Sequence, residues 1–246
     1  MIPTGSCPIK ILLSAALLYL ALEKLWSRAH AKPSDLLESI GFENEPEMRD
    51  DLVKFQNEHR RKFIAADMAE LQWDPKLAEI AQKHADLCSN YHTDHEGVYG
   101  RRLEYDGGIV GENIWGGTND KVDMQSVADV WFEEGADYDC DQSGWECCKA
   151  TCSHFSQVIW SKSKRIGCGF SKCSMIDSWK AKGWSKSDDI FKYYQLFSIV
   201  CYYSPGGNVA HETAFVPATK LDPWCSKCDG KEGVDYTCEN HLCRYK

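Results

Sequence analysis

The feature that most constrains this chain is its cysteine content, 13 cysteines in 246 residues. A reducing cytosol leaves thiols unpaired, whereas an oxidising compartment joins them into disulfides. Apolar residues make up 43% of the sequence, which is enough for a sizeable core and excludes a disordered chain. The composition therefore predicts a secreted, disulfide-bonded globular protein.

The N-terminal residues agree with secretion. Residues 11–22 are apolar except for Ser14, Lys10 precedes them, and the small residue Ala31 follows within ten positions. A helix of that length rises only about 18 Å, short of the roughly 30 Å hydrocarbon core of a bilayer. We therefore predict that residues 1–31 are a signal peptide cleaved after Ala31, in preference to a membrane anchor.

Removal of residues 1–31 changes both the charge and the cysteine count. The formal net charge moves from −9 for the whole chain to −11, because the segment holds three basic residues and one acidic residue. This acidic balance disfavours binding to nucleic acid. The cut also removes Cys7 and leaves an even number of cysteines, as complete disulfide pairing requires.

The remaining cysteines fall into two groups. Eight lie between Cys88 and Cys201, and four lie between Cys225 and Cys243 in a tail with few apolar residues. Each group can close on itself, although the spacing alone leaves the pairing open. We interpret the tail as an appendage held together by disulfides.

Three segments have helical periodicity. Apolar residues and His59 recur at three- and four-residue steps from Met48 to Phe63. A second helix is predicted to begin at Asp74-Pro75, an N-cap followed by proline, and to carry its buried face as far as Tyr91. A third is predicted over 120–134, and it places Glu134 on the buried stripe.

Two short apolar segments, 165–170 and 195–203, predict neighbouring antiparallel strands joined by a long polar hairpin loop. Residues 109–115 lie between two Gly-Gly pairs, and Glu112-Asn113 interrupts any strand alternation. This segment is predicted to be an irregular loop. Helices flanking a small sheet predict an α+β sandwich.

Four ionisable side chains stand at the edges of apolar segments: His92, Glu112, Glu134 and His154. Two imidazoles and two carboxylates are a suitable ligand set for Zn²⁺ or another divalent cation. No compact zinc-binding spacing is present, so from the residues alone all four can equally be polar groups satisfied within the core.

Three motifs in a fixed order give a resemblance to a known family. They are Gly-Glu-Asn-Ile at 111–114, His-Phe-Ser-Gln-Val-Ile-Trp at 154–160 and Cys-Tyr-Tyr-Ser-Pro-Gly-Gly-Asn-Val at 201–209. This arrangement resembles the CAP superfamily of cysteine-rich secretory, antigen 5 and pathogenesis-related proteins, most closely the venom allergen-like proteins of parasitic worms. Gln56, Ser153 and Tyr202 depart from the usual family residues.

The resemblance implies a three-layer α-β-α sandwich with a small antiparallel sheet and a cysteine-rich C-terminal tail. It covers residues 48–216, so we expect an N-terminal arm at 32–47 and a disulfide-rich extension at 217–246. It also implies that four side chains line one cavity: His92, Glu112, Glu134 and His154. Either these side chains bind a divalent metal, or hydrogen bonds and water hold them in place.

Two disulfide expectations follow. Cys168 and Cys201 are predicted to cross-link neighbouring strands, and the tail cysteines are predicted to pair only with one another.

The resemblance further implies binding of small lipids, either a sterol or a fatty acid. Sterols are expected near the loop at 137–153, where Tyr138 and Trp145 offer aromatic faces. The alternative is that these side chains only stabilise the loop. Separately, residues 162–192 carry eight basic and three acidic residues, which suit an anionic membrane surface or a sulfated glycan unless they form a solvated loop.

We expect a binding protein and not an enzyme. Two rival functions stay open. A metal-dependent hydrolase would use a zinc-bound water with Glu112 or Glu134 as general base. A protein-interaction antigen would act through the tail at 225–243 and bind no lipid.

Overall fold

The computed structural model describes residues 38–39, 41–94, 102–118, 121–138, 152–174, 195–228 and 235–246. The predicted signal peptide, Trp145 and most of the basic segment after Lys172 lie outside these residues. All described elements belong to one compact unit, Glu38–Lys246. Within it, no helix combines the length and the apolar character needed to cross a bilayer.

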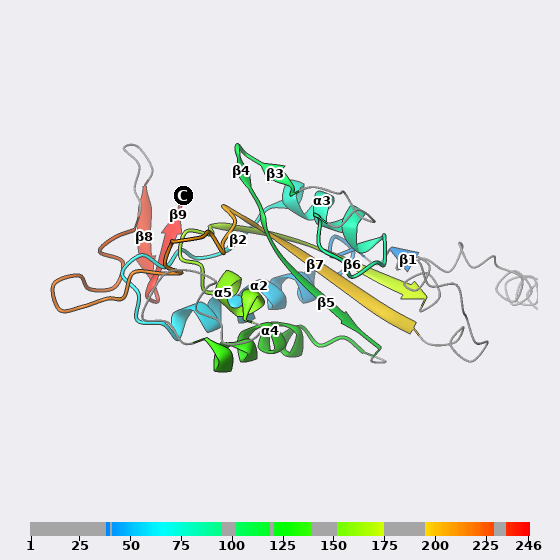
Figure 1. The fold of residues 1–246 in the computed structure, drawn as a ribbon, viewed down its shortest axis with the longest axis horizontal. Helices are drawn as coiled ribbons and strands as arrows, with labels where there is room; N and C mark the ends of the chain where they lie inside the picture. The colour runs from blue at the N-terminus through cyan, green and yellow to red at the C-terminus, as the bar shows by residue number, and fades with distance from the viewer. Residues whose placement is uncertain are drawn as a thin grey trace, which may run out of the picture. The chain divides into compact units, whose positions relative to one another are not determined.

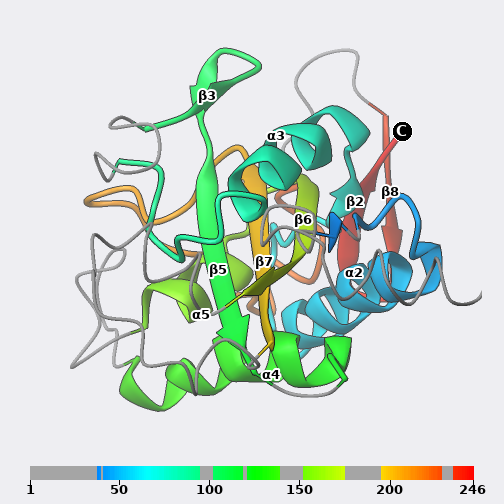
Figure 2. The same cartoon turned by 90° about the vertical axis from the view of Figure 1, so that its right-hand side faces the viewer.

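A β-sheet lies between two layers of helices (Figures 1 and 2). The strands run in the order β1 (Glu38–Ser39), β6 (Arg165–Ser174), β7 (Gln195–Ser204) and β5 (Gly111–Gly117). These four pair antiparallel, and the two-residue β2 (Gln72–Trp73) adds to β6 in parallel.

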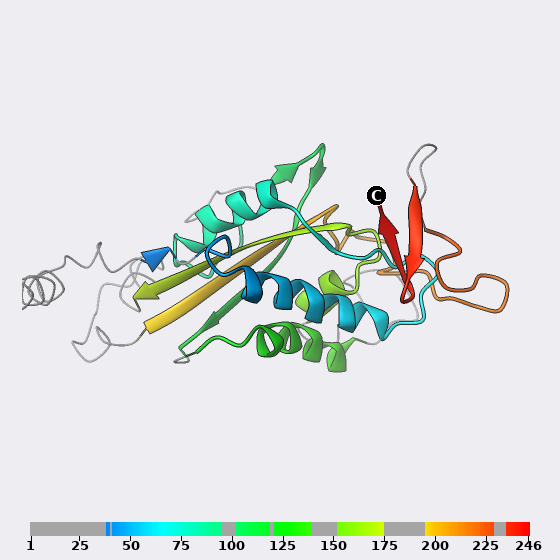
Figure 3. The ribbon, with the colours of Figure 1, turned by 180° about the vertical axis from the view of Figure 1, so that it is seen from behind.

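Among the α-helices in the described residues, one covers one face of the sheet and three cover the other. The first layer is α3 (Pro75–Ala85), and the second contains α2 (Pro46–Arg61), α4 (Met124–Glu133) and α5 (Ser153–Val158). Figure 3 shows the second layer from behind. The predicted α+β fold, a three-layer α-β-α sandwich, is therefore confirmed.

Two small hairpins complete the described fold. One is formed by β3 (Glu104–Tyr105) and β4 (Gly108–Ile109), and the other by β8 (Tyr236–Glu239) and β9 (Leu242–Tyr245).

Strand β7 is buried on both faces, which explains its nearly continuous apolar sequence. Ile199, Cys201 and Tyr203 join the main core under α2, α4 and α5. Val200 and Tyr202 join a smaller core under α3. Successive side chains of β7 therefore point to opposite faces of the sheet and pack into two different cores.

The prediction of an irregular loop at 109–115 is wrong. Residues 111–117 form β5, whose seven residues all pair with β7. Gly111 leaves room for Gln157, because a Cβ at this position would lie 1.8 Å from the Gln157 side-chain oxygen and would displace it from its hydrogen bond with the Gly207 nitrogen. The alternation was hidden because Asn113 is fully buried yet polar, and its amide donates to the carbonyl of His154 and the hydroxyl of Tyr203.

Helix α3 starts where it was predicted to start but ends earlier than predicted. Asp74 caps α3 as predicted and accepts from the backbone nitrogens of Lys76 and Leu77 at 3.0 and 3.1 Å. The helix ends at Ala85 and not at Tyr91, since Cys88 and Asn90 adopt positive φ angles of 55° and 52°.

The other two helices also differ in length from their predictions. Helix α2 begins at Pro46, inside the predicted arm, and ends at Arg61, before Phe63. Helix α4 begins at Met124 and ends at Glu133, so Glu134 is its C-cap residue and opens a short 3₁₀ helix, Glu134–Asp137.

The disulfide predictions are confirmed. Cys168 and Cys201 face each other across β6 and β7 and are bonded. In the tail, Cys225 is bonded to Cys238 and Cys228 to Cys243.

Arg60 joins α2 to the segments around it. Its fully buried guanidinium donates to the carbonyl oxygens of Ala69, Val158, Trp160 and Ser163 at 2.6–3.1 Å. Burial lowers its pKa to about 9, so it stays protonated at neutral pH.

Candidate functional site

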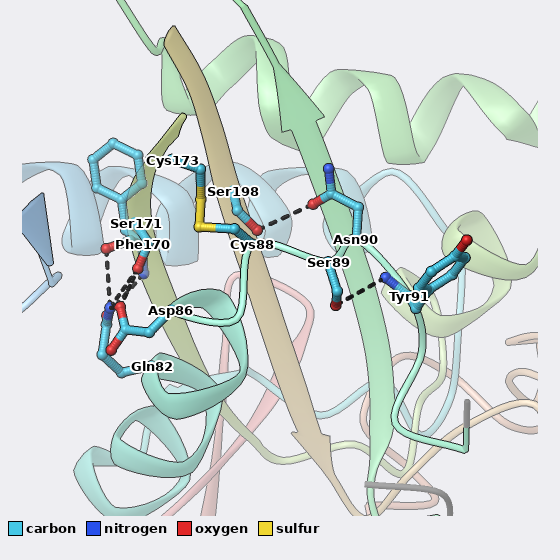
Figure 4. Close-up of a disulfide and its surroundings, with 10 residues drawn as sticks. All are labelled: Gln82, Asp86, Cys88, Ser89, Asn90, Tyr91, Phe170, Ser171, Cys173 and Ser198. Carbon is cyan, nitrogen blue, oxygen red and sulfur yellow. Dashed lines mark hydrogen bonds between the residues drawn. A yellow bond between two sulfur atoms is a disulfide. The ribbon is translucent and has the colours of Figure 1, made fainter. Parts of the chain in front are cut away.

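His92 is carried by a segment that a disulfide fixes to the sheet. Cys88, at the start of this segment, is bonded to Cys173 at the end of β6 (Figure 4). The hydroxyl of Ser198 on β7 donates to the Asn90 side-chain oxygen at 3.1 Å. These two attachments bring His92 to the edge strand β5, although the segment has no regular secondary structure.

Glu112 on β5 accepts a short hydrogen bond from Nδ1 of His92. The Glu112 side chain is only 8% exposed, while the His92 side chain is 54% exposed. Burial alone would raise the pKa of Glu112, but the imidazoles of His84 and His92 outweigh burial and lower it. The same hydrogen bond raises the pKa of His92. The pair therefore favours an ionised carboxylate beside a protonated imidazole.

A third histidine, His84 of α3, joins this pair. In the sequence His84 is only a polar residue on an apolar helix face, which does not indicate a function. His84 is 1% exposed, and its Nε2 lies 2.8 Å from the Tyr91 carbonyl oxygen. Because a carbonyl only accepts, Nε2 carries the hydrogen. Nδ1 lies 2.7 Å from the Tyr202 hydroxyl and 3.5 Å from Oε2 of Glu112.

Glu134 and His154 form a second pair. Oε1 of Glu134 lies 2.7 Å from Nδ1 of His154, and Oε2 accepts from the His154 backbone nitrogen at 3.1 Å. Glu134 is in position because α4 ends there, and His154 because it lies in the first turn of α5. The carboxylate thus holds both the ring and the start of its helix.

The two pairs lie next to each other. The ring centroids of His92 and His154 are 6.3 Å apart, and the rings are nearly parallel. Within the described residues, no three of the four predicted ligands offer atoms that all lie within 4.8 Å of one another. Cys225, Cys228 and Cys243 do so, but all three sulfurs are in disulfides and are not available as thiolates.

The sequence profile of the CAP family, described as the cysteine-rich secretory protein family, matches residues 53–203. The chain belongs to the CAP family. It is 34% identical to GLIPR1-like protein 1 of Mus musculus over 203 residues, which are 81% of this chain and 73% of that protein.

Two other CAP relatives are longer than this chain. Identity to the protein lon-1 of Caenorhabditis elegans is 32%, over 71% of this chain and 48% of lon-1. Identity to peptidase inhibitor 16 of Mus musculus is 29%, over 78% of this chain and 32% of that protein. The chain thus spans about half the length of lon-1 and about a third of the length of peptidase inhibitor 16.

Solved CAP structures share the fold. BmVAL-1 superposes with a TM-score of 0.54 at 21% identity, over 82% of this chain and 95% of that one. Na-ASP-1 superposes with a TM-score of 0.53 at 21% identity, over 80% of this chain and 46% of that one. The resemblance to the venom allergen-like proteins of helminths is therefore confirmed at the level of fold.

In this CAP domain the donor set fits a divalent cation. Each histidine has its Nδ1 next to a carboxylate, which leaves Nε2 as the nitrogen able to ligate a metal. Nε2 of His154 is buried without a hydrogen-bond partner, and Oε2 of Glu112 makes no hydrogen bond, although Nδ1 of His84 lies 3.5 Å from it. Buried polar atoms normally have a partner, and a bound cation would supply one to each.

Of the two residues predicted to bind lipid, Tyr138 is described and Trp145 lies outside the described residues. The ring of Tyr138 packs on Phe155 of α5 with centroids 5.1 Å apart. Its environment raises the pKa of the half-buried phenol, because burial disfavours the charged form. This packing is expected if Tyr138 only stabilises the loop. The part of the ring that is still exposed can also contact a ligand.

Proposed function

We propose that this chain is a secreted CAP protein that acts by binding, with a His/Glu cavity that takes zinc or another divalent cation. The observation that carries the proposal is the pairing of both histidines through Nδ1 with a glutamate, because this fixes the tautomer needed for ligation through Nε2. NaASP2, which shares the fold with a TM-score of 0.53 at 19% identity, was solved with Zn²⁺.

In this proposal His92 and His154 hold the cation, and Glu112 and Glu134 act as ligands or as partners of the imidazoles. A bound cation supplies a positive charge and a coordination centre. The carboxylates compensate that charge, and the anchored segment before His92 limits how far the first imidazole can move.

The test is zinc titration of the secreted, disulfide-bonded protein by calorimetry, with native mass spectrometry to count bound ions. His92→Gln and His154→Gln should each weaken zinc binding at least tenfold. His241→Gln is the matched control, since His241 is an exposed histidine in the C-terminal tail. Equal affinity in all four proteins would refute the cavity site.

We further propose that the loop at 137–153, which carries Tyr138 and Trp145, binds a sterol. A fatty acid is the second lipid class, and the resemblance assigns it to a groove between two helices. The support is the resemblance together with the side chains involved. A sterol offers a large apolar face and one hydroxyl, which suits aromatic rings. A charged His/Glu cavity does not suit it, because unpaired buried polar groups cost several kcal/mol, roughly 2 or more each.

This proposal predicts that sterol and metal binding are separable. Scrambling residues 142–149 should weaken saturable binding of a radiolabelled sterol and leave the zinc titration unchanged. Equal sterol binding by both proteins would move the site elsewhere. Absence of sterol and fatty-acid binding in both would favour the protein-interaction function through the tail at 225–243.

Secretion and the absence of catalysis are part of the same proposal. The disulfides fit an oxidising compartment. N-terminal sequencing of protein secreted from cultured cells should begin at Lys32. A metal-dependent hydrolase would instead show turnover on model esters and peptides that a chelator abolishes, and such turnover would overturn the binding function.

A further inference from the structure

A cleft of about 730 Å³ lies where the C-terminal extension, residues 217–246, meets the body of the domain. One wall comes from the segment between α5 and β6 and from the turn after β7. The other comes from the extension, through Lys227, Tyr245 and Lys246. Its size is within the range of pockets that hold small ligands, about 300–1,000 Å³.

The walls of this cleft are fixed relative to each other. The backbone nitrogen of Cys243 donates to the carbonyl of Met68 at 2.7 Å, and that of Lys227 donates to the carbonyl of Ala66 at 2.9 Å. Leu242 is fully buried against Met68. The extension is therefore docked on the body, and the cleft is formed before any ligand binds.

The cleft is basic in a chain with a net charge of −9. Its lining contains five basic side chains and two acidic ones. The basic residues are Lys162, Lys164, Arg165, Lys227 and Lys246. Two of them have carboxylate partners outside the lining: Lys227 pairs with Asp222 at 2.9 Å, and Arg165 pairs with Asp106.

Of the two acidic residues, Asp67 is committed to the fold. Its Oδ1 accepts from the Val216 backbone nitrogen at 2.8 Å, and its Oδ2 accepts from the Ser161 hydroxyl at 2.7 Å. Glu212 pairs with Lys162 at 2.6 Å, but both side chains are about half exposed. Such solvent-exposed pairs contribute little to stability, so an anionic ligand can replace the carboxylate, and the same holds for the half-exposed Lys227–Asp222 pair.

Aromatic surface accompanies the charges. The Lys164 amine lies 3.8 Å from the ring centroid of Tyr245, and this contact joins the body to the extension. Tyr245 lines the cleft with a partly buried ring, whereas Trp160 lies beneath the surface and is only 1% exposed. A concave site with amines and aromatic edges suits a ligand that has several fixed anionic groups on an apolar frame.

We infer that this cleft binds a sulfated saccharide. Sulfate groups match the amines of Lys162, Lys164 and Lys227, and the C–H face of a sugar ring matches the exposed part of Tyr245. An anionic membrane presents the same kind of charge on a broad surface, which cannot enter a concave cleft. The proposed metal and lipid functions are not needed for this site.

The test is calorimetry of the full secreted chain with a fully sulfated heparin-derived tetrasaccharide. The variant Lys162→Gln/Lys164→Gln/Lys227→Gln should bind at least tenfold more weakly. The matched control is Lys76→Gln/Lys83→Gln/Lys121→Gln, which removes the same charge from exposed lysines outside the cleft and should bind within twofold of the parent. Near-UV circular dichroism establishes that both variants fold.

Three results would overturn the inference. The first is the absence of binding by the parent. Equal losses of affinity in both variants would count in the same way, because they would show a general attraction between charges and not a site in the cleft. The second is loss of binding in Lys180→Gln/Lys182→Gln/Lys186→Gln, which would assign the ligand to the basic segment before β7. The third is equal binding of the desulfated tetrasaccharide, or stronger lysine-dependent binding to phosphatidylserine vesicles.

Discussion

Nδ1 of His84 lies 3.5 Å from Oε2 of Glu112, so a buried histidine of α3 stands behind a glutamate of the candidate metal cavity. His84 also contacts the Tyr202 hydroxyl and the Tyr91 carbonyl. It therefore ties together α3, β7 and the segment that leads to His92. We interpret His84 as a positioning residue for Glu112.

This arrangement predicts a measurable role for His84. His84→Phe leaves the Tyr91 carbonyl and the Tyr202 hydroxyl without this partner, which should lower the free energy of unfolding by about 1–3 kcal/mol. Loss of a partner behind a metal ligand should weaken zinc binding by about 10-fold or more. His84→Gln keeps a donor and an acceptor and should lose less in both measurements. Unchanged stability and zinc affinity in His84→Phe would contradict the role.

A second prediction concerns pH and zinc. Imidazole must be neutral to bind a metal, and the pKa of His92 is raised above 6.5 by Glu112. The apparent zinc affinity should therefore begin to fall above pH 6.5 as the pH is lowered, at a higher pH than for an isolated histidine. Zinc titrations between pH 5 and 8 check this. Affinity that stays constant over this range would show that His92 is not a ligand.

Without metal, the stability that the His92–Glu112 pair contributes should rise as the pH is lowered from 8.5 to 5.5, whereas zinc affinity should fall. A histidine whose pKa is higher in the folded state than in the unfolded state stabilises the fold. This stabilisation is complete below the unfolded-state pKa and is lost as the pH rises through the folded-state pKa. The lowered pKa of Glu112 makes its contribution present above its unfolded value and lost as pH falls through the folded value. In chelator, His92→Gln should therefore cost more stability at pH 5.5 than at pH 8.5.

A fourth prediction tests Arg60. Arg60→Met removes the donor that four buried carbonyl groups share, and we expect a loss of about 3 kcal/mol or more or failure to secrete the protein. Arg60→Lys should also destabilise, because an ammonium cannot reproduce the planar fork of donors. Arg49→Met is the control on the same helix, where the pair with the 70% exposed Asp50 should contribute less than about 1 kcal/mol. Guanidinium unfolding measures all three.

The sequence allowed the cavity residues to be predicted better than the strand that carries one of them. His92, Glu112, Glu134 and His154 stand in recognisable motifs, and the structure brings them together as two pairs. Strand β5 was missed because its buried positions are polar or glycine and depend on β7 and Gln157, which are distant in sequence. His84 was missed for a related reason, since a histidine on an apolar helix face does not reveal which group it meets.

The last prediction concerns the Cys168–Cys201 disulfide, which crosses adjacent residues of β6 and β7 with a Cα–Cα distance of 4.1 Å. The bond closes a loop of 33 residues, and the chain-entropy description gives about 3–4 kcal/mol for a loop of that length. Cys168→Ala/Cys201→Ala should therefore lower the stability of the whole domain, because both sulfurs are in the main core. Cys225→Ala/Cys238→Ala is the control, since that pair lies in the C-terminal extension and closes a separation of 13 residues. Guanidinium unfolding followed by tryptophan fluorescence should show a lower midpoint for the first variant and a smaller change for the second. If the two variants lose equal stability, the extension and the body unfold as one cooperative unit, and the special contribution of the bond between the strands is refuted.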